Sequence, residues 1–380
     1  MERILIVDDE RLNINVLNEL LKSNYKIMAA INGEQALKAA SSKNPPDLIL
    51  LDIMMPEMDG YEVCKRLKAD DQTKDIPIIF VTAMGQESDE TKGLELGAAD
   101  YLTKPISPAI VEARVQTQIK LQRGRKDLQL AYELIEAHKT RMEKELNVAR
   151  DIQLSMLPKT FPEHNDFTLH AIMNAALEVG GDFYDYFFID EDNLCLCVGD
   201  VSGKGVPAAL FMAITKSMIK SRAADDLSTA NIMTHVNREI SQNNESSMFI
   251  TVFLSILNLK TGELTYTNAG HNPPFIKHAG SEIDRIDQRH GPVAGAVEGF
   301  TYKESSLFLS EGDTLLLYTD GVTEAISSAN ELYGEQRLIN TLGLNHNSPM
   351  DLNSYILNDV LKFEDGTDQT DDITILSLSF

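Results

Sequence analysis

The 380-residue sequence predicts an α/β domain with a doubly wound sheet, then a long helix, then an α+β domain. Three observations predict this order. Apolar runs alternate with helical patterns up to about residue 120, proline is absent between Pro108 and Pro158, and short strand-like runs between turn residues follow. The sequence therefore predicts a first domain at 1–120, a helical linker at 121–157 and a second domain at 158–380.

The first domain is predicted to contain five strands, each followed by a helix. Residues 4–7, 47–53 and 76–83 are near-continuous apolar runs, as expected for parallel strands that are buried on both faces. Weaker strands are predicted at 25–30 and 99–102. Segments between the strands, such as NINVLNELLK and GYEVCKRLKA, repeat apolar residues at helical spacing. Five βα units predict a doubly wound, flavodoxin-like sheet whose sites lie beyond the carboxyl ends of its strands.

The linker is predicted to form one long helix. It contains a single glycine, Gly124, and the Leu157-Pro158 pair ends it. A seven-residue series runs through Leu121, Leu128, Ile135, Met142, Ala149 and Met156. The positions three residues further along are poor in apolar side chains. The pattern fits either a two-stranded coiled coil, which would produce a homodimer, or a single helix that packs on its own domains.

After Pro158 the sequence predicts an α+β domain built on antiparallel sheets, a β-sandwich flanked by helices. Runs such as NLCLCVGD, MFITVFLSILNL and DTLLLYTDG are short and lie between turn residues. Two helical stretches, at 207–223 and 229–242, interrupt them. Cys195 and Cys197 alternate along one predicted strand, and we interpret them as small buried residues rather than as a metal-binding pair.

Acidic residues are concentrated in the second domain. The chain carries 34 Lys and Arg against 58 Asp and Glu, a formal net charge of −24, and residues 158–380 contribute a net of −19. Such acidity argues against nucleic acids and anionic membranes as partners and favours cations, including metal ions. Because the N-terminus lacks a signal-peptide pattern and no apolar run reaches about 18 residues, we expect a cytoplasmic protein.

Carboxylates follow two predicted strands of the first domain. Asp8 and Asp9 come after the first strand, and Asp52 ends the third. Because the carboxyl ends of parallel strands converge, these side chains would repel one another without a hard cation such as Mg²⁺. Thr82 ends the fourth strand and Lys104 follows the fifth, so a hydroxyl and an ammonium can contact a phosphoryl group there. The set predicts phosphoryl transfer to an aspartate.

These motifs resemble the receiver domain of bacterial response regulators, over about residues 1–120. The matching segments are VDDE, LLDIMMPEMDG, VTA and YLTKP. The resemblance implies that a histidine kinase supplies the phosphoryl group, whose added charge repacks this face of the domain. The implied roles are phosphoacceptor for Asp52, Mg²⁺ binding for Asp8, Asp9 and Asp52, pairing with the phosphoryl group for Lys104, and switching for Thr82 and Tyr101.

In the second domain, aspartates recur beside glycine at strand ends. The segments are GGDFYD (180–185), GDVSGKG (199–205), TDG (319–321) and TDDIT (370–374). Asp200, Asp320 and Asp371 each adjoin an apolar run, and their small neighbours let carboxylate oxygens reach a metal ion. A single Asp-Gly pair is usually a turn, but several from separate strands predict a two-metal site that activates water for attack on phosphorus.

Two motifs in this region invite interpretations that we reject. GDVSGKG is not a phosphate-binding loop, because its glycine spacing is one residue too short and Lys204 precedes Gly205. NAGHNPP contains His271, which we interpret as a turn residue rather than as a catalytic acid or base.

The whole set resembles the PPM-type serine/threonine phosphatases, in the bacterial branch of sporulation and stress-response phosphatases, from about residue 147 to 380. The match also includes NVARDIQLSMLP, NAGHNPP and LLYTDGVTEA. The resemblance implies two Mn²⁺ or Mg²⁺ ions bridged by Asp200, with Asp185 and Asp372 supporting the ligands without binding metal. It also implies a substrate, the phosphoserine form of the anti-sigma-factor antagonist, a protein of the STAS fold. The implied ligands are Asp182, Asp200, the Val201 carbonyl, Asp320 and Asp371.

Together the domains predict a phosphatase that is controlled by phosphorylation of Asp52. The helix would transmit the change through the geometry of a dimer. Phosphorylation could either activate or inhibit the enzyme. The alternative is a phosphorylation-gated adaptor, a weak pseudophosphatase that binds a sigma-factor regulator. The four ligand candidates favour the enzyme. An output domain that binds nucleic acid fits poorly with the −19 charge. The sequence also has no Gly-rich nucleotide box, so kinase activity within this chain is not expected and a separate kinase must supply the phosphoserine.

Overall fold

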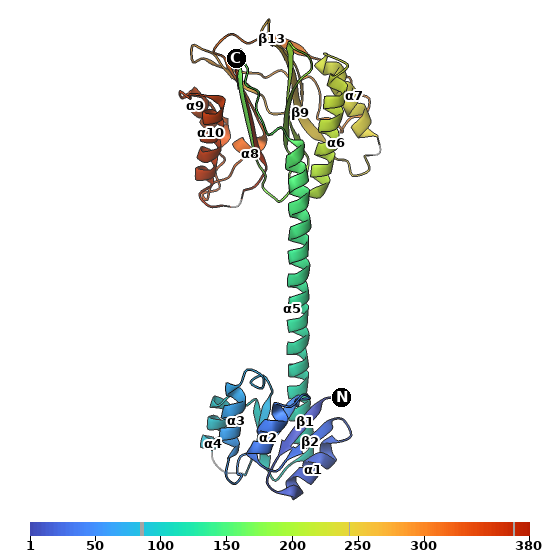
Figure 1. Ribbon diagram of the computed structural model, residues 1–380, viewed down its shortest axis with the longest axis vertical. Helices are drawn as coiled ribbons and strands as arrows, with labels where there is room; N and C mark the ends of the chain where they lie inside the picture. Colours follow the sequence, from blue (N-terminus) through green and yellow to red (C-terminus); the bar gives the residue numbers. More distant parts are fainter. Residues whose placement is uncertain (84–86, 243, 368) are drawn as a thin grey trace. The chain divides into compact units, whose positions relative to one another are not determined.

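The computed structural model describes residues 1–83, 87–242, 244–367 and 369–380 (Figure 1). The chain divides into an N-terminal unit, Met1–Lys139, and a C-terminal unit, Thr140–Phe380. Helix α5 (Pro108–Met156) contributes residues to both units. The predicted order of an α/β domain, a long helix and an α+β domain is confirmed.

In its described residues, the N-terminal unit holds a parallel sheet of five strands in the order β2-β1-β3-β4-β5. The strands are β1 (Arg3–Val7), β2 (Lys26–Ala30), β3 (Leu48–Asp52), β4 (Ile78–Ala83) and β5 (Asp100–Lys104). The register pairs Val7 with Leu51 and Asp52 with Val81. The carboxyl ends of β1, β3 and β4 therefore meet at one edge, where the sequence predicts the first site.

Helices cover both faces of this sheet (Figure 1). They are α1 (Arg11–Leu21), α2 (Gly33–Ala40), α3 (Gly60–Ala69), α4 (Glu87–Glu95) and the first part of α5. Successive residues of a strand face opposite sides, so Leu5 packs with α2 and α3 whereas Ile4 packs with α1 and α5. Helix α3 begins where the Asp59 carboxylate accepts a hydrogen bond from the backbone N–H of Glu62.

Helix α5 runs without a break for 49 residues, which confirms the prediction of a long helix. Val111 and Val115 are buried against the sheet of the N-terminal unit, so the helix begins as the last helix of that fold. It continues through residue 121, where the sequence places the start of the linker. Every residue from 127 to 145 is exposed. The middle of the helix therefore presents apolar side chains to solvent.

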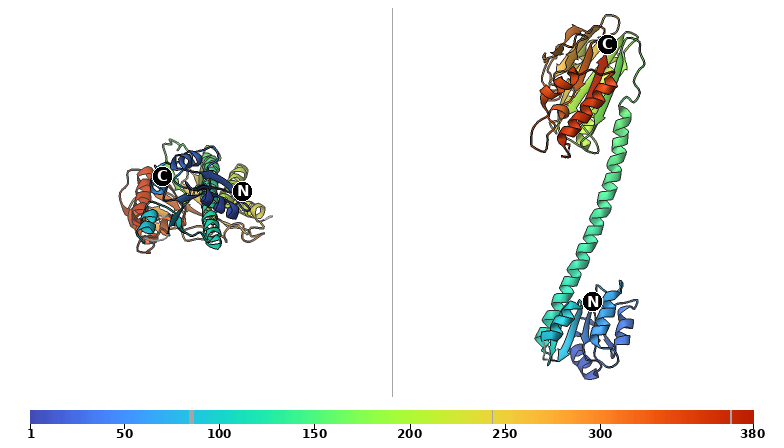
Figure 2. Two further views of the ribbon diagram at one scale, coloured as in Figure 1. Left: turned by 90° about the horizontal axis from the view of Figure 1, so that it is seen from below. Right: turned by 90° about the vertical axis from the view of Figure 1, so that its left-hand side faces the viewer.

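The described part of the C-terminal unit contains two antiparallel sheets of five strands each (Figure 2). The first has the order β13-β10-β9-β8-β7 and the second β12-β11-β14-β15-β6. The strands of the first are β7 (Phe183–Phe188), β8 (Asn193–Val201), β9 (Ile250–Asn258), β10 (Glu263–Ala269) and β13 (Ser305–Phe308). Those of the second are β6 (Thr168–Asn174), β11 (Phe275–Lys277), β12 (Ile283–Arg285), β14 (Thr314–Tyr318) and β15 (Ile373–Ser379). The predicted sandwich is confirmed.

Helices flank the two sheets on their outer sides (Figure 1). They are α6 (Val206–Ala223) and α7 (Thr229–Ser241) on the first sheet, α9 (Gly334–Gly343) and α10 (Pro349–Glu364) on the second, and the short α8 (Asp320–Thr323) after β14. Strand β14 shows the layering, because Leu315 and Leu317 belong to the core shared by both sheets while Leu316 packs with α9 and α10.

The described part of the C-terminal unit contains three helices that the sequence reasoning does not name, the short α8 and the longer α9 and α10. Helix α10 has a readable start signal, since Ser348 Oγ accepts a hydrogen bond from the backbone N–H of Asp351 and Pro349 occupies the first turn. Cys195 and Cys197 are both buried, as interpreted from the sequence. Among the described helices, none combines the length and apolar character that a membrane crossing requires.

Candidate functional site

Three carboxylates gather at the carboxyl edge of the parallel sheet. Asp8 follows β1 and Asp52 ends β3, and one oxygen of each of Asp8, Asp9 and Asp52 lies within 4.8 Å of the others. Asp8 and Asp52 are buried, whereas Asp9 is exposed. An all-oxygen set of this kind fits a hard cation such as Mg²⁺.

Neighbouring groups orient these carboxylates. The Asn13 side-chain amide donates to both oxygens of Asp8, each at 3.0 Å. The Lys104 ammonium lies 2.9 Å from Asp52 Oδ1 and 3.1 Å from Asp8 Oδ2. Burial raises the pKa of Asp52, and the bond from Lys104 offsets part of that effect. A side chain at Gly60 would place its Cβ 2.3 Å from the Asp52 carbonyl oxygen, so glycine is required there.

The two residues that the resemblance names as a switch lie on β4 and β5 next to this site. Thr82 is half-buried, and its hydroxyl donates to the Ala83 carbonyl oxygen at 3.2 Å. Tyr101 is half-buried as well, and the Arg114 guanidinium lies 5.2 Å from the centre of its ring. Thr82 and Lys104 thus lie near the carboxyl ends of β4 and β5, at the edge that carries Asp52, whereas Tyr101 lies earlier on β5, level with Leu51.

In the C-terminal unit, the four predicted aspartates come from both sheets. Asp182 precedes β7 and Asp200 lies near the end of β8, in the first sheet. Asp320 opens α8 directly after β14, and Asp371 stands just before β15, in the second sheet. Each sheet therefore contributes two carboxylates, and each of the four comes from a different strand end.

Burial and mutual repulsion raise the pKa values of three of these carboxylates. Burial raises the pKa of Asp200 to about 7, and repulsion from Asp320 and Asp371 adds to the effect. Burial also raises the pKa of Asp320 to about 6, again with a contribution from Asp371. For Asp182, burial and repulsion from Asp200 raise the pKa. The site concentrates negative charge that a bound cation would neutralise.

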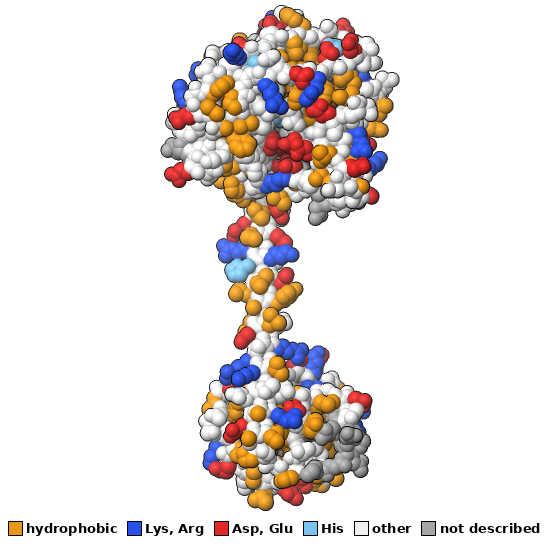
Figure 3. Space-filling view, turned by 180° about the vertical axis from the view of Figure 1, so that it is seen from behind, with side chains coloured by type: hydrophobic (Ala, Val, Ile, Leu, Met, Phe, Trp, Pro, Cys, Tyr) orange, Lys and Arg blue, Asp and Glu red, His pale blue; other side chains and the backbone are white. Residues whose placement is uncertain are grey.

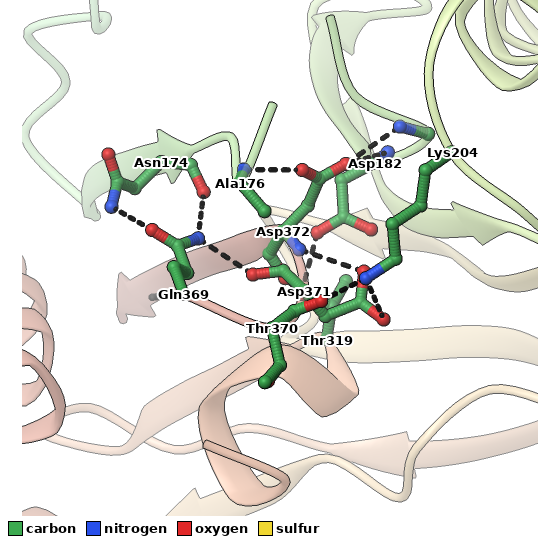
Figure 4. Close-up of polar contacts among 10 residues, drawn as sticks. Asn174, Ala176, Asp182, Lys204, Thr319, Gln369, Thr370, Asp371 and Asp372 are labelled. Atoms are coloured by element: carbon green, nitrogen blue, oxygen red, sulfur yellow. Dashed lines mark hydrogen bonds and ion pairs between the residues drawn. The ribbon is translucent and has the colours of Figure 1, made fainter. Parts of the chain in front are cut away.

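Asp372 holds the loop that carries Asp182 (Figure 4). Its carboxylate accepts hydrogen bonds from the backbone N–H groups of Ala176 and Gly181, at 2.8 and 2.7 Å. A Cβ at Gly180 would lie 2.3 Å from Asp372 Oδ2, so the approach requires glycine. Asp372 therefore acts by positioning the backbone next to Asp182.

Thr319 is a further buried contact of the site that the sequence reasoning does not name. Its hydroxyl donates to Asp182 Oδ2 at 2.7 Å (Figure 4). The same hydroxyl accepts from the backbone N–H of Thr374 at 2.9 Å. Thr319 directly precedes Asp320. It therefore links the Asp182 carboxylate, from the first sheet, to the end of β14 in the second sheet. Nothing in the local sequence marks it, since Thr beside Asp-Gly is also an ordinary turn residue.

Asp185 is buried and pairs with a lysine. Its carboxylate forms a buried ion pair with Lys216 of α6, with Nζ and Oδ2 separated by 2.5 Å. The ion pair links strand β7 to helix α6. The resemblance places Asp185 behind the metal ligands, and the structure shows that its partner is this lysine.

His271 lies in a turn that the Asn268 side chain closes. The Asn268 side chain accepts from the His271 backbone N–H at 2.8 Å and donates to its carbonyl oxygen at 3.1 Å. The ring is buried, with Nδ1 2.8 Å from the Thr251 hydroxyl, and burial lowers the pKa of His271 to about 4. The interpretation as a turn residue agrees with this geometry.

Helix α5 reaches the metal-site loop within the C-terminal unit. The buried Gln153 side chain donates to the Gly180 carbonyl oxygen at 2.6 Å and accepts from the Gly180 backbone N–H at 3.1 Å. Gly180 is two residues before Asp182. The segment NVARDIQLSMLP that carries Gln153 was part of the resemblance, but a glutamine in a helix does not by itself reveal such a contact.

The residues of this site fit divalent metal ions. Four carboxylates provide oxygen donors, and a Cβ at Gly181 would lie 3.0 Å from the Val201 carbonyl oxygen, which places that oxygen beside Asp182. Among the described residues, only Asp8, Asp9 and Asp52 bring three ligand atoms within 4.8 Å of one another. The four aspartates of the C-terminal unit are therefore spaced more widely than those of the receiver site. A wider ligand set suits two ions about 3.5–4 Å apart.

Comparison with known proteins finds relatives for both units. The family model for stage II sporulation protein E (SpoIIE) matches residues 190–380, and that for the response regulator receiver domain matches residues 4–116. The chain is 32% identical over 180 residues to phosphoserine phosphatase RsbU of Bacillus subtilis, covering 47% of this chain and 53% of that protein. It is 31% identical over 261 residues to protein IcfG of Synechocystis sp., covering 62% of this chain and 41% of that protein. The chain thus spans about half or less of these relatives.

A solved structure supports the fold of the C-terminal unit. The SiaA-PP2C domain of Pseudomonas aeruginosa matches with a TM-score of 0.57 and 22% sequence identity, covering 64% of this chain and 99% of that chain. At this identity the match shows a shared fold.

Proposed function

Because this chain belongs to the stage II sporulation protein E (SpoIIE) family and carries a response regulator receiver domain, we propose that it is a metal-dependent serine/threonine protein phosphatase controlled by phosphorylation of Asp52. The observation that carries the proposal is the convergence of four carboxylates from strand ends of both sheets. Their raised pKa values show buried, mutually repelling charge, which a pair of divalent cations would neutralise.

The chain's own groups have distinct tasks in this proposal. Two Mn²⁺ or Mg²⁺ ions, when bound, supply the Lewis acidity that activates water and polarises the phosphoryl oxygens. Asp200, which is buried and repelled by Asp320 and Asp371, would bridge the ions, while Thr319 and Asp372 orient the Asp182 loop. The proposed ligands are Asp182, Asp200, the Val201 carbonyl, Asp320 and Asp371.

The receiver site supports the regulatory half of the proposal. Asp52 is the phosphoacceptor for a histidine kinase, with Mg²⁺ held by Asp8, Asp9 and Asp52. The Lys104 ammonium already contacts Asp52 at 2.9 Å and would pair with the added phosphoryl group. Thr82 and Tyr101, on the neighbouring strands, would then reorient.

The proposed substrate is a phosphoserine protein of the STAS fold, an anti-sigma-factor antagonist. The relative RsbU is named a phosphoserine phosphatase, and the family resemblance supplies the substrate class. A separate kinase must produce that phosphoserine.

Helix α5 provides the proposed link between receiver and phosphatase. Residues 127–145 are all exposed, and the exposed seam includes Leu128, Ile135 and Met142 at seven-residue spacing. Such a seam is typical of a helix that pairs with a second copy, so we infer a homodimer. At the other end, Gln153 bonds the loop of Asp182, so a change in helix packing can reach a metal ligand.

The test measures Mn²⁺-dependent phosphate release from phosphoserine STAS proteins, with and without beryllofluoride as a mimic of the phosphorylated receiver. We expect release that needs Mn²⁺, is lost in Asp320→Ala and changes when beryllofluoride is added. Normal turnover by Asp320→Ala would contradict the two-metal site. An unchanged rate with beryllofluoride would contradict receiver control, and no release from any phosphoserine protein would favour the adaptor.

A further inference from the structure

Lys204 is a cation at the exposed end of the acidic site. It lies in the loop between β8 and α6, and its ammonium is 3.1 Å from Asp371 Oδ2 (Figure 4). The same ammonium donates to the Thr370 carbonyl oxygen. Across the described residues, no other Lys or Arg forms an ion pair with Asp182, Asp200, Asp320 or Asp371.

The ammonium stands where a substrate can reach it. The side chains of Lys204 and Asp371 are 37% and 41% exposed, whereas Asp182 is buried at the other end of the site. A phosphoserine on another protein must enter from the exposed end. Lys204 is therefore on the entry side of the carboxylates.

Charge balance gives a cation at the entry a task in binding a phosphoryl group. Four carboxylates and two divalent ions cancel, so a loaded site has no net charge with which to attract a phosphate dianion. The surrounding domain is strongly acidic, and Figure 3 shows acidic side chains gathered on one face of the C-terminal unit. A single ammonium at the entry supplies the positive charge that is otherwise missing.

The glycines on either side of Lys204 leave open space around its loop. Gly203 and Gly205 flank it with φ of 85° and 75°, and a Cβ at either position would meet nothing within 4 Å. An ion pair that is more than a third exposed adds little stability, so the contact between Lys204 and Asp371 costs little to exchange. A divalent ion on Asp371 would repel the ammonium, and the flexible four-carbon stem would let it turn toward the entry.

We propose that Lys204 binds the phosphoryl group of the substrate, after releasing Asp371 to a metal ion. The proposal rests on the phosphatase function proposed above and adds a residue that recognises the substrate's phosphate. Its contribution is a charge-assisted hydrogen bond, with no proton transfer and no covalent step.

The test compares Lys204→Met, which keeps the length of the side chain, with Lys204→Arg, which keeps its charge. Lys260→Met is the matched control, because Lys260 forms an exposed ion pair with Asp192 in the same unit. Calorimetry on the full chain measures Mn²⁺ binding to the metal-free protein and inorganic phosphate binding to the Mn²⁺-loaded protein. Steady-state kinetics with a phosphoserine peptide give kcat and KM.

For Lys204→Met we expect phosphate affinity and kcat/KM to fall roughly tenfold to a hundredfold, the value of one charge-assisted hydrogen bond. Mn²⁺ affinity should stay the same or increase, because a competing cation has been removed. Lys204→Arg should recover most of the phosphate affinity, and Lys260→Met should match the wild type.

Two results would overturn the proposal. Phosphate binding within twofold of the wild type in Lys204→Met would show that the ammonium does not contact phosphate. A tenfold loss of Mn²⁺ affinity in the same variant would show that Lys204 orders Asp371 instead. If the wild type hydrolyses no phosphoserine, the proposed function fails, but the phosphate-binding measurement still decides the role of Lys204.

Discussion

The side chain of Gln153 forms two hydrogen bonds with the backbone of Gly180, one to its carbonyl oxygen and one from its N–H. Gln153 is in the last turns of helix α5, and Gly180 is two residues before the carboxylate of Asp182. The helix and the candidate metal site thus share a buried polar contact. Both partners are buried, so water cannot replace the lost bonds when the contact breaks.

Gln153→Ala is expected to weaken the metal site. The change leaves the N–H and carbonyl of Gly180 unpaired, at a cost of about 1–3 kcal/mol for each buried group. We expect a lower melting temperature of the C-terminal unit and weaker Mn²⁺ binding, measured by calorimetry. Gln129→Ala is the control, because the Gln129 side chain donates to Glu133 on the exposed face of the same helix. Equal Mn²⁺ affinity in the two variants would show that the contact does not support the site.

Thr319→Val is expected to reduce Mn²⁺ affinity by roughly tenfold to a hundredfold, the usual effect of removing a hydrogen bond to a metal ligand. The substitution keeps the shape of the side chain but removes the hydroxyl that donates to Asp182. Titration of the metal-free protein with Mn²⁺ measures the change. Thr265→Val, on β10 beside Ser306, provides a matched control. An unchanged Mn²⁺ affinity would show that Thr319 does not orient Asp182.

The metal-free protein is expected to lose stability as the pH rises. Burial with repulsion from neighbouring aspartates raises the pKa of Asp200 to about 7 and that of Asp320 to about 6. Between about pH 4, the ordinary range of Asp, and pH 7, the folded chain therefore binds more protons than the unfolded chain, and its stability falls as those protons leave. Mn²⁺ competes with the protons, so its affinity should rise over the same range.

Calorimetric melting with EDTA and with Mn²⁺, at pH 5 and pH 8, checks this expectation. In EDTA the melting temperature of the C-terminal unit should be higher at pH 5, and Mn²⁺ should stabilise the unit more at pH 8. Asp200→Asn should flatten the dependence in EDTA, because it removes the group with the higher pKa. The same slope in the variant and the wild type would contradict the assignment.

Asp52→Asn is expected to abolish phosphoryl uptake by the N-terminal unit. Acetyl phosphate with Mg²⁺ should modify the wild type at one aspartate, detected by intact-protein mass spectrometry. Asp59→Asn is a matched control, because Asp59 caps α3 and asparagine caps a helix equally well. Uptake by Asp52→Asn at the wild-type level would place the phosphoacceptor elsewhere.

Ile135→Glu is expected to convert a dimer of the full chain into monomers. Ile135 is 63% exposed and belongs to the seven-residue seam of α5, where a charge would be buried between two helices. Sedimentation equilibrium measures the mass of the species. Thr140→Glu is the control, since residue 140 lies about 140° around the helix from residue 135. A wild type that is monomeric at all concentrations would exclude pairing through this seam.

Much of the fold could be predicted because its signals are local. The apolar runs of β1, β3 and β4 identify buried parallel strands, and the carboxylates at their ends identify the receiver site. The helical stretches at α6 and α7 follow from the spacing of their apolar residues. Helices α9 and α10 were not predicted, although the Ser348-Pro349 pair is a start signal for α10.

The sequence by itself determined which residues are available for chemistry: the aspartates at strand ends, the glycines that permit close approach, and the unbroken helix between the units. Only the tertiary structure decided which of them meet. Gln153 reaches Gly180 across 27 positions, Thr319 reaches Asp182 across 137, and Lys204 meets Asp371. Local propensity acts over a few neighbouring residues, whereas these contacts depend on how two sheets and a helix pack, which fixes distances between segments that are far apart along the chain.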